Sequence, residues 1–140
     1  MRLKIQLLTN WSHLQNVQGP ACFQGHKSSA AIQVSWAEYD GQKPLRVISI
    51  DELKQMAVTF GQKNGSGALV ESACGSCFFG SFGTATFSSA THPRIQVWFL
   101  TDGRNFILAT HICCEKPDPD EVRETEAIVS SLALGPGNPD

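Results

Sequence analysis

The sequence predicts an α+β domain in which an antiparallel, meander-like sheet carries two amphipathic helices. Apart from a short additional strand at 22–27, hydrophobic periodicity gives the order strand, strand, helix, four strands and a final helix. The strands expected at 94–101 and 105–114 are apolar on both faces, whereas a sheet with one face in water alternates apolar and polar residues. Both faces must therefore be covered. We favour one helix on each face, which is an α/β/α sandwich, and a second subunit is the other way to cover a face.

Length and composition narrow the class of protein. The chain has 140 residues, which suits one domain, and we expect a single globular domain over 1–134 with a flexible C-terminal tail over 135–140. Its 41% hydrophobic and 17% charged residues are typical of a globular protein. The net charge of −2 lacks the basic excess of a nucleic-acid binder, so we expect no nucleic-acid partner.

No membrane segment or leader is expected. The apolar stretch 95–100 falls far short of the ~20 residues that span a bilayer. The N-terminus alternates polar and apolar residues after Arg2, unlike the continuous apolar core of a signal peptide. We therefore expect a cytoplasmic protein. Its five cysteines are odd in number and unevenly spaced, so a disulfide framework is not expected in that reducing compartment.

The first elements are short. Alternation predicts a strand over 2–8, and residues 11–14 indicate a short helical turn. A short strand over 22–27 and a longer one over 31–39 follow, the latter ended by Asp40-Gly41.

A capping box predicts the first helix. The Ser49 side chain can accept from the amide three residues on, while Glu52 reaches back to the Ser49 amide. Gly61 and Asn64-Gly65 then end the helix. Apolar residues recur at helical spacing between these signals, at Ile50, Leu53, Ala57 and Phe60.

The second half is predicted to be a run of strands and a helix. Strands are expected at 67–74, 83–88, 94–101 and 105–114, and Asp102-Gly103 between the last two indicates a hairpin. The closing helix starts with Asp118 as N-cap, Pro119 at the first position and an acidic first turn. Its apolar stripe comprises Val122, Thr125, Val129 and Leu132.

The order of these elements carries a family resemblance. A hairpin of apolar strands ends at 110–113, an acidic loop follows, and a helix closes on 128–132. With this pattern the C-terminal half resembles the PsbP-like superfamily, and the strands expected at 2–8 and 31–39 fit the same order. The resemblance implies an α/β/α sandwich that is mostly non-catalytic and docks to partner proteins. It does not extend over 74–83, and it carries over no functional residue.

A Cys-x-x-Cys motif formed by Cys74 and Cys77 raises a second hypothesis, a thiol-redox pair or half of a zinc site. A thioredoxin-type pair needs a helix start, but an aromatic, glycine-broken stretch follows here. The other half of a zinc site would come from His111 and Cys113, which share one strand face. We keep Cys74, Cys77, His111 and Cys113 as the alternative metal set. The leading interpretation treats the cysteines as buried apolar residues, with no metal and no cofactor.

No catalytic residues are predicted. The chain has no Gly-x-Ser-x-Gly elbow, and its four histidines are scattered. The glycine-rich stretch 61–67 follows a helix and places its lysine wrongly for a phosphate-binding loop. A cysteine–histidine pair, Cys77 or Cys113 with His92, stays open at this level.

The predicted function is partner binding. Phe78, Phe79 and Phe82 lie in a glycine-flanked loop, which is unusual unless the loop packs on the core or meets a partner. From Glu115 onward the chain has seven acidic and two basic residues, which indicates a solvated helix face or a docking face for a basic partner. We therefore predict a small non-catalytic domain that binds a protein partner or forms a homodimer through Phe78, Phe79 and Phe82.

Overall fold

A seven-stranded antiparallel sheet dominates the structure, a computed structural model that describes residues 2–6, 11–14, 21–25, 30–37 and 47–135. Two helices and a two-stranded pair, β1 with β9, complete the described part. The elements are β1 Arg2–Lys4, β2 Trp11–Leu14, β3 Ala21–Gly25, β4 Ala31–Ala37, α1 Ile50–Lys63, β5 Ala68–Ser76, β6 Ser81–Ser88, β7 Arg94–Thr101, β8 Phe106–Cys113, α2 Pro119–Ser130 and β9 Ala133–Gly135.

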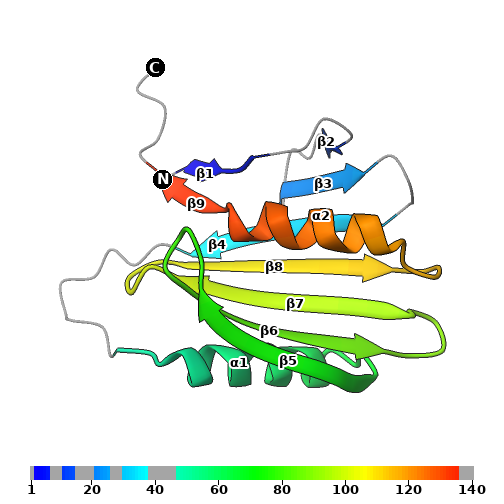
Figure 1. Ribbon diagram of the computed structural model, residues 1–140. Helices are drawn as coiled ribbons and strands as arrows, with labels where there is room; N and C mark the ends of the chain where they lie inside the picture. Colours follow the sequence, from blue (N-terminus) through cyan, green and yellow to red (C-terminus); the bar gives the residue numbers. More distant parts are fainter. Residues whose placement is uncertain (1, 7–10, 15–20, 26–29, 38–46, 136–140) are drawn as a thin grey trace.

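The sheet lies between the two helices. Its strand order is β2-β3-β4-β8-β7-β6-β5, and every neighbouring pair is antiparallel. α1 packs on one face, against β5, β6 and β7, and α2 lies on the other face, in front of β4 in Figure 1. The expected α/β/α arrangement is confirmed. Neither helix in the described part of the chain is long and apolar enough to cross a bilayer.

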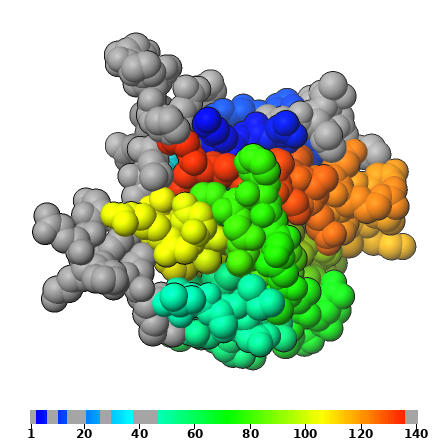
Figure 2. Space-filling model, turned by 60° about the vertical axis from the view of Figure 1, so that its left-hand side comes forward, coloured from blue at the N-terminus to red at the C-terminus, as the bar shows by residue number. Residues whose placement is uncertain are grey.

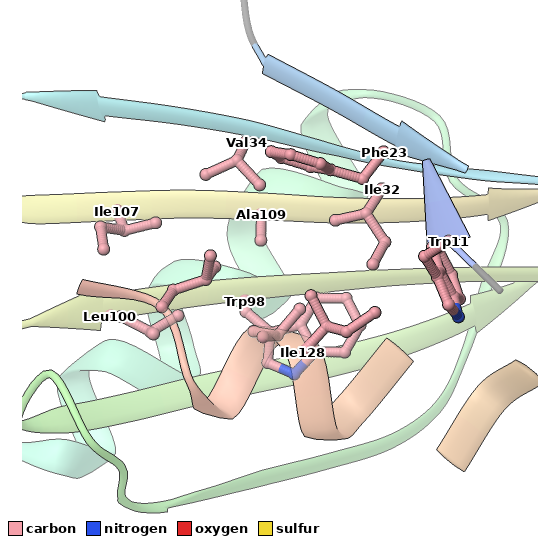
Figure 3. Close-up of a cluster of buried hydrophobic side chains, with 11 residues drawn as sticks. Trp11, Phe23, Ile32, Val34, Trp98, Leu100, Ile107, Ala109 and Ile128 are labelled. Atoms are coloured by element: carbon pink, nitrogen blue, oxygen red, sulfur yellow. The ribbon is translucent and has the colours of Figure 1, made fainter. Parts of the chain in front are cut away.

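Each face of the sheet has its own apolar core. On the α2 face the cluster brings together α2 and five strands, as Figure 3 shows for most of its members. On the α1 face a smaller cluster joins α1 to β6 and β7. The two clusters are Trp11, Phe23, Ile32, Val34, Trp98, Leu100, Ile107, Ala109, Ile128, Val129 and Leu132, and Ala57, Val58, Ala85, Phe87, Ile95 and Val97. This explains why the strands at 94–101 and 106–113 are apolar on both faces.

The predicted helix signals are confirmed. The Ser49 side chain accepts from the Glu52 amide at 3.1 Å, and the Glu52 carboxylate accepts from the Ser49 amide at 3.3 Å. α1 approaches the sheet closely at Gly83, where an added Cβ would lie 2.1 Å from the backbone nitrogen of Lys54. At α2 the Asp118 carboxylate accepts from two amides of the first turn, and Pro119 is the first helical residue.

The N-terminal predictions need correction. Residues 11–14 are not a helical turn but strand β2, because pairing with β3 and burial of the Trp11 ring override the local turn signal. The strand expected over 2–8 is described only as Arg2–Lys4, and it pairs with β9 instead of joining the main sheet. The expected tail began at Gly135, which in fact pairs with Arg2, while 136–140 lie outside the described residues.

Candidate functional site

The tip of the β5–β6 hairpin, residues 77–80, is anchored to the end of α2. The amide of Phe78 donates to the Ser130 carbonyl at 3.3 Å. Within the tip, Cys77 and Gly80 exchange backbone hydrogen bonds of 3.0 and 3.2 Å. An added Cβ on Gly80 would lie 2.3 Å from the Thr101 carbonyl oxygen, so glycine is required for this close approach. The tip is therefore held on both sides.

The three phenylalanines of the predicted partner-binding loop have different surroundings. Phe78 is 80% exposed. Phe79 and Phe82 are half-buried and pack against the apolar cluster on the α2 face. Of the three, Phe78 is thus the residue that is available to a partner.

A groove of about 560 Å³ lies beside Phe78, between α2 and the segment that follows β1. Ile5 and Ala127 add apolar surface to it, and its other lining residues are polar: Lys4, Gln6, Ser130 and Ser131. The amide of Gln6 donates to the Ser131 hydroxyl at 3.4 Å, which joins the two walls. In Figure 2 the hairpin tip, in green, reaches the blue β1 and the red β9. We call Phe78, Ile5, Ala127 and these four polar residues the hairpin-tip surface.

The cysteines of the Cys-x-x-Cys motif are separated by the sheet. Cys74 pairs with Gly83 and faces α1, where its thiol lies 3.8 Å from the Asp51 carboxylate. Cys77 packs against the cluster on the opposite face. His111 and Cys113 are on β8, and β7 and β6 lie between that strand and β5. The described residues include no group of three or more His, Cys, Asp or Glu side chains that could hold a metal, so the alternative metal set receives no geometric support.

A buried polar cluster lies under the start of α2, and the sequence reasoning identified its His111 and Cys113 but not its Glu121. The Cys113 thiol is 3.7 Å from Nδ1 of His111, and His111 Nε2 is 4.0 Å from the Glu121 carboxylate. Burial, reinforced by the charge of Arg94, lowers the pKa of His111 to about 4, and burial raises the pKa of Cys113. A neutral imidazole and a protonated thiol at neutral pH do not make an activated nucleophile. The i, i+2 spacing on β8 predicted the shared face of His111 and Cys113, whereas Glu121 joins them only through the packing of α2 on the sheet.

The open cysteine–histidine pairs are not formed with His92. Its ring lies in the β6–β7 turn, with Nδ1 3.1 Å from the Thr91 hydroxyl, and its amide donates to Ser89.

The acidic residues from Glu115 onward also make contacts within the chain. Glu121 is buried, Glu124 accepts the indole N–H of Trp11, and Glu126 lies 3.8 Å from Arg94. These surroundings within the chain account for three of the acidic residues, so a basic partner protein is not needed to explain them.

Comparisons with known proteins show the fold of the chain. Cyanobacterial PsbP (CyanoP) from Synechocystis sp. PCC 6803 superposes with a TM-score of 0.56, at 12% identity, over 95% of this chain and 92% of that one. A protein from Bacteroides thetaiotaomicron VPI-5482 superposes with a TM-score of 0.54 at 11% identity, over 96% of this chain but only 45% of its own length. No family model and no curated protein sequence matches the chain. The resemblance to the PsbP-like fold is therefore confirmed in three dimensions.

Proposed function

We propose that this domain, with its PsbP-like fold, is a non-catalytic binding module that docks a partner protein on the hairpin-tip surface. The observation that carries the proposal is the 80% exposure of Phe78 on a backbone that is hydrogen-bonded to α2. An exposed aromatic side chain on a fixed backbone buries large apolar area on binding and loses little conformational entropy.

The composition of the surface indicates the chemistry of the partner. Its centre is apolar, with Phe78, Ile5 and Ala127, and its rim carries one cation, Lys4, with serine and glutamine side chains. This arrangement, an apolar anchor inside a polar rim, is typical of transient protein interfaces. We expect the partner to have an apolar pocket that receives the Phe78 ring. We also expect it to place a carboxylate or carbonyl oxygen beside Lys4.

The chemistry of the buried cluster supports a non-catalytic role. His111 and Cys113 lie within contact distance of each other, yet burial keeps both neutral at pH 7. Thiol catalysis requires a thiolate that solvent and substrate can reach, and Cys113 is only 4% exposed.

Photo-crosslinking tests this proposal. A photoreactive phenylalanine analogue at position 78 should give one dominant crosslinked adduct in cells that make the protein. An untagged copy of the protein that carries Phe78→Ser, added as competitor, should fail to suppress this adduct. Competitor carrying Val70→Ser, in which a 62% exposed side chain of the same hairpin is changed, should suppress it as well as wild type does. If the Phe78→Ser competitor suppresses the adduct equally well, Phe78 is not the anchor.

The same experiment separates a heterologous partner from a second copy. An adduct of twice the chain mass, with concentration-dependent sedimentation of wild type but not of Phe78→Ser, would identify the partner as a second copy. An adduct of any other mass identifies a different protein, whose binding must then be reproduced with purified components.

A further inference from the structure

A pocket of about 220 Å³ opens on the α2 face of the sheet, close to its β5 edge. Its floor is formed by side chains of β5, β6 and β7, and a flank of α2 forms one wall. The β-ladders place the floor residues in two rows across these strands: Glu71, Thr86 and Gln96, and Ala73, Thr84 and Trp98. The polar groups of β7 therefore lie at the inner end of the pocket, and β5 lies at its outer end.

The Trp98 indole carries a buried donor without an acceptor. Its ring belongs to the apolar cluster on the α2 face, and the residue, which lines the pocket, is only 4% exposed. In the described part of the chain the indole N–H makes no hydrogen bond, and Figure 3 shows its nitrogen on the side of the cluster away from Phe23 and Val34. A donor that is buried without an acceptor costs free energy, so this position is suited to an acceptor that a ligand brings.

Gln96 presents a second donor, and Arg94 strengthens it. The Gln96 amide oxygen accepts from the Arg94 guanidinium, and the amide nitrogen donates one hydrogen to the Thr84 hydroxyl at 3.0 Å. The second amide hydrogen has no acceptor among the residues that the structure describes. A hydrogen bond from a cation to the amide oxygen polarises the amide and makes its N–H groups stronger donors.

The buried side of the pocket is thus short of acceptors. Arg94 adds to the shortage, because its Nη1 is also buried without a partner within the described ranges. The Thr84 hydroxyl cannot relieve it, since that hydroxyl already accepts from Gln96 and donates to the Val97 carbonyl at 2.7 Å. A ligand that fits this end of the pocket must therefore bring an acceptor atom.

The two carboxylates of the lining do not select a charged ligand. Glu71 and Glu126 are exposed to solvent, and the Arg94 guanidinium attracts both of them, with Glu126 at 3.8 Å. A cationic ligand would leave the indole N–H of Trp98 unused, and an anionic ligand would meet two carboxylates beside one guanidinium. A neutral carbonyl oxygen satisfies the unused donors without either cost.

The remaining lining describes the body of the ligand. It is apolar, and it comprises Ala73, Cys77, Phe82, Leu100 and Val129. The volume is below the roughly 300–1,000 Å³ of pockets for drug-sized ligands, so the ligand must be small. One flat apolar ring beside the carbonyl group suits these walls.

We propose that this pocket binds a small neutral carbonyl compound, such as a primary amide or a ketone with one apolar ring. Trp98 and Gln96 are two residues apart on β7, so their donors project from the same face of the sheet toward the carbonyl oxygen. The ring packs against Phe82 and Val129. This site is distinct from the hairpin-tip surface, since Phe78 lines the groove and not the pocket.

Three probes of the same shape test the proposal by ¹H–¹⁵N NMR. The chain has three tryptophans, so the indole signal of Trp98 is the one that remains in both Trp11→Phe and Trp36→Phe. Benzamide at pH 7 should shift that signal saturably. Benzamidinium, which has an N–H group in place of the carbonyl oxygen, should leave it unmoved, and benzoate should bind more weakly than benzamide.

The same titrations state what would overturn the proposal. No saturable shift with benzamide would mean that water alone serves these donors. An equal shift with benzamidinium would show that the carbonyl oxygen is not recognised. Tighter binding of benzoate than of benzamide would make the pocket an anion site.

Matched variants locate the binding. Ala73→Leu adds bulk to an exposed residue of the lining and should weaken benzamide binding about tenfold. Ala68→Leu makes the same change at an exposed position of β5 outside the lining and should leave the affinity unchanged. Trp98→Phe, followed by the backbone amide signal of Thr84, removes the donor and should weaken binding about fivefold. Equal affinities of Ala73→Leu and wild type would contradict the assignment. Phe78→Ser should bind benzamide normally, so a failure of the partner-binding proposal would not affect this result.

Discussion

Trp11 and Glu124 are joined across 113 positions of the sequence, because the indole N–H of Trp11 donates to the Glu124 carboxylate at 2.9 Å. Trp11 is on β2, one of the two edge strands of the sheet, and Glu124 is on α2. The Trp11 ring is also part of the apolar cluster on the α2 face. The four-residue strand β2 is therefore held by a side chain that bonds to the helix as well as by its ladder with β3.

Removal of this donor should destabilise the fold. Trp11→Phe keeps an aromatic ring but leaves the part-buried Glu124 carboxylate without the indole N–H. We expect a loss of about 2 kcal/mol in the free energy of unfolding, measured by urea denaturation. Trp36→Phe alters a tryptophan that is 38% exposed and should cost much less. Equal losses in the two variants would show that the hydrogen bond contributes nothing.

Gly83→Ala should be more damaging than a glycine-to-alanine change elsewhere on the hairpin. The new Cβ would lie 2.1 Å from the Lys54 nitrogen and 2.2 Å from the Leu53 carbonyl carbon, so α1 would have to move away from the sheet. We expect a loss of about 3 kcal/mol. Gly75→Ala meets only the edge of the Phe82 ring, at 3.2 Å, and a small rotation of that ring relieves the contact. A Gly83→Ala protein as stable as Gly75→Ala would refute this packing of α1.

The stability of the protein should fall as the pH is lowered from about 6.5 to about 4. Burial and the charge of Arg94 lower the pKa of His111 from 6.5 to about 4, outweighing the carboxylate of Glu121 at 4.0 Å. Below pH 6.5 the unfolded chain therefore takes up a proton that the folded chain does not, and this favours unfolding. Above pH 6.5 both states hold a neutral imidazole and the contribution is constant.

The size of this effect follows from the shift. A difference of this size in pKa corresponds to about 3 kcal/mol, lost progressively across that pH window. Urea denaturation at several pH values measures it, and His111→Gln should show a much flatter dependence between pH 6.5 and pH 4. If wild type and His111→Gln lose stability in parallel, another group is responsible.

The neighbouring phenylalanines of the hairpin tip should respond differently to the same change. Phe79→Ser removes a ring that packs against the α2-face cluster and should cost about 2 kcal/mol of stability. Phe78→Ser removes a ring that is 80% exposed and should change stability by less than about 0.5 kcal/mol. Thermal unfolding of the two purified variants checks this order. A Phe78→Ser protein that unfolds more readily than Phe79→Ser would mean that Phe78 has a structural role.

Local signals were enough for much of the architecture. The capping box of Ser49 and Glu52 and the N-cap of Asp118 operate within a few residues, and both helices start where these signals place them. The hairpin at Asp102-Gly103 is equally local: the Asp102 carboxylate accepts from the Asn105 amide at 2.7 Å, and Gly103 adopts a φ of +97°. Apolar residues on both faces of β7 and β8 also predicted that the sheet is covered on both sides.

Long-range contacts decided the rest. Residues 11–14 are a strand because β3 offers hydrogen-bond partners and the sheet offers a place to bury Trp11, and neither is visible in a short window. The partner of β1 is β9, at the other end of the chain. The placement of the Cys-x-x-Cys motif was likewise visible only in the tertiary structure. Cys74 and Cys77 are three residues apart, but Cys74 faces α1 and Cys77 packs on the opposite face of the sheet.

Two properties of this protein thus have different origins. Its secondary structure and its class of fold follow from signals a few residues long, since caps, turns and hydrophobic periodicity act locally. Which strand lies beside which, and which phenylalanine of the hairpin tip faces water, both depend on the packing of distant segments. The tip of the hairpin shows this: the amide of Phe78 is held by the Ser130 carbonyl at the end of α2, more than 50 positions away, and this contact leaves the Phe78 ring exposed while Phe79 packs against the cluster.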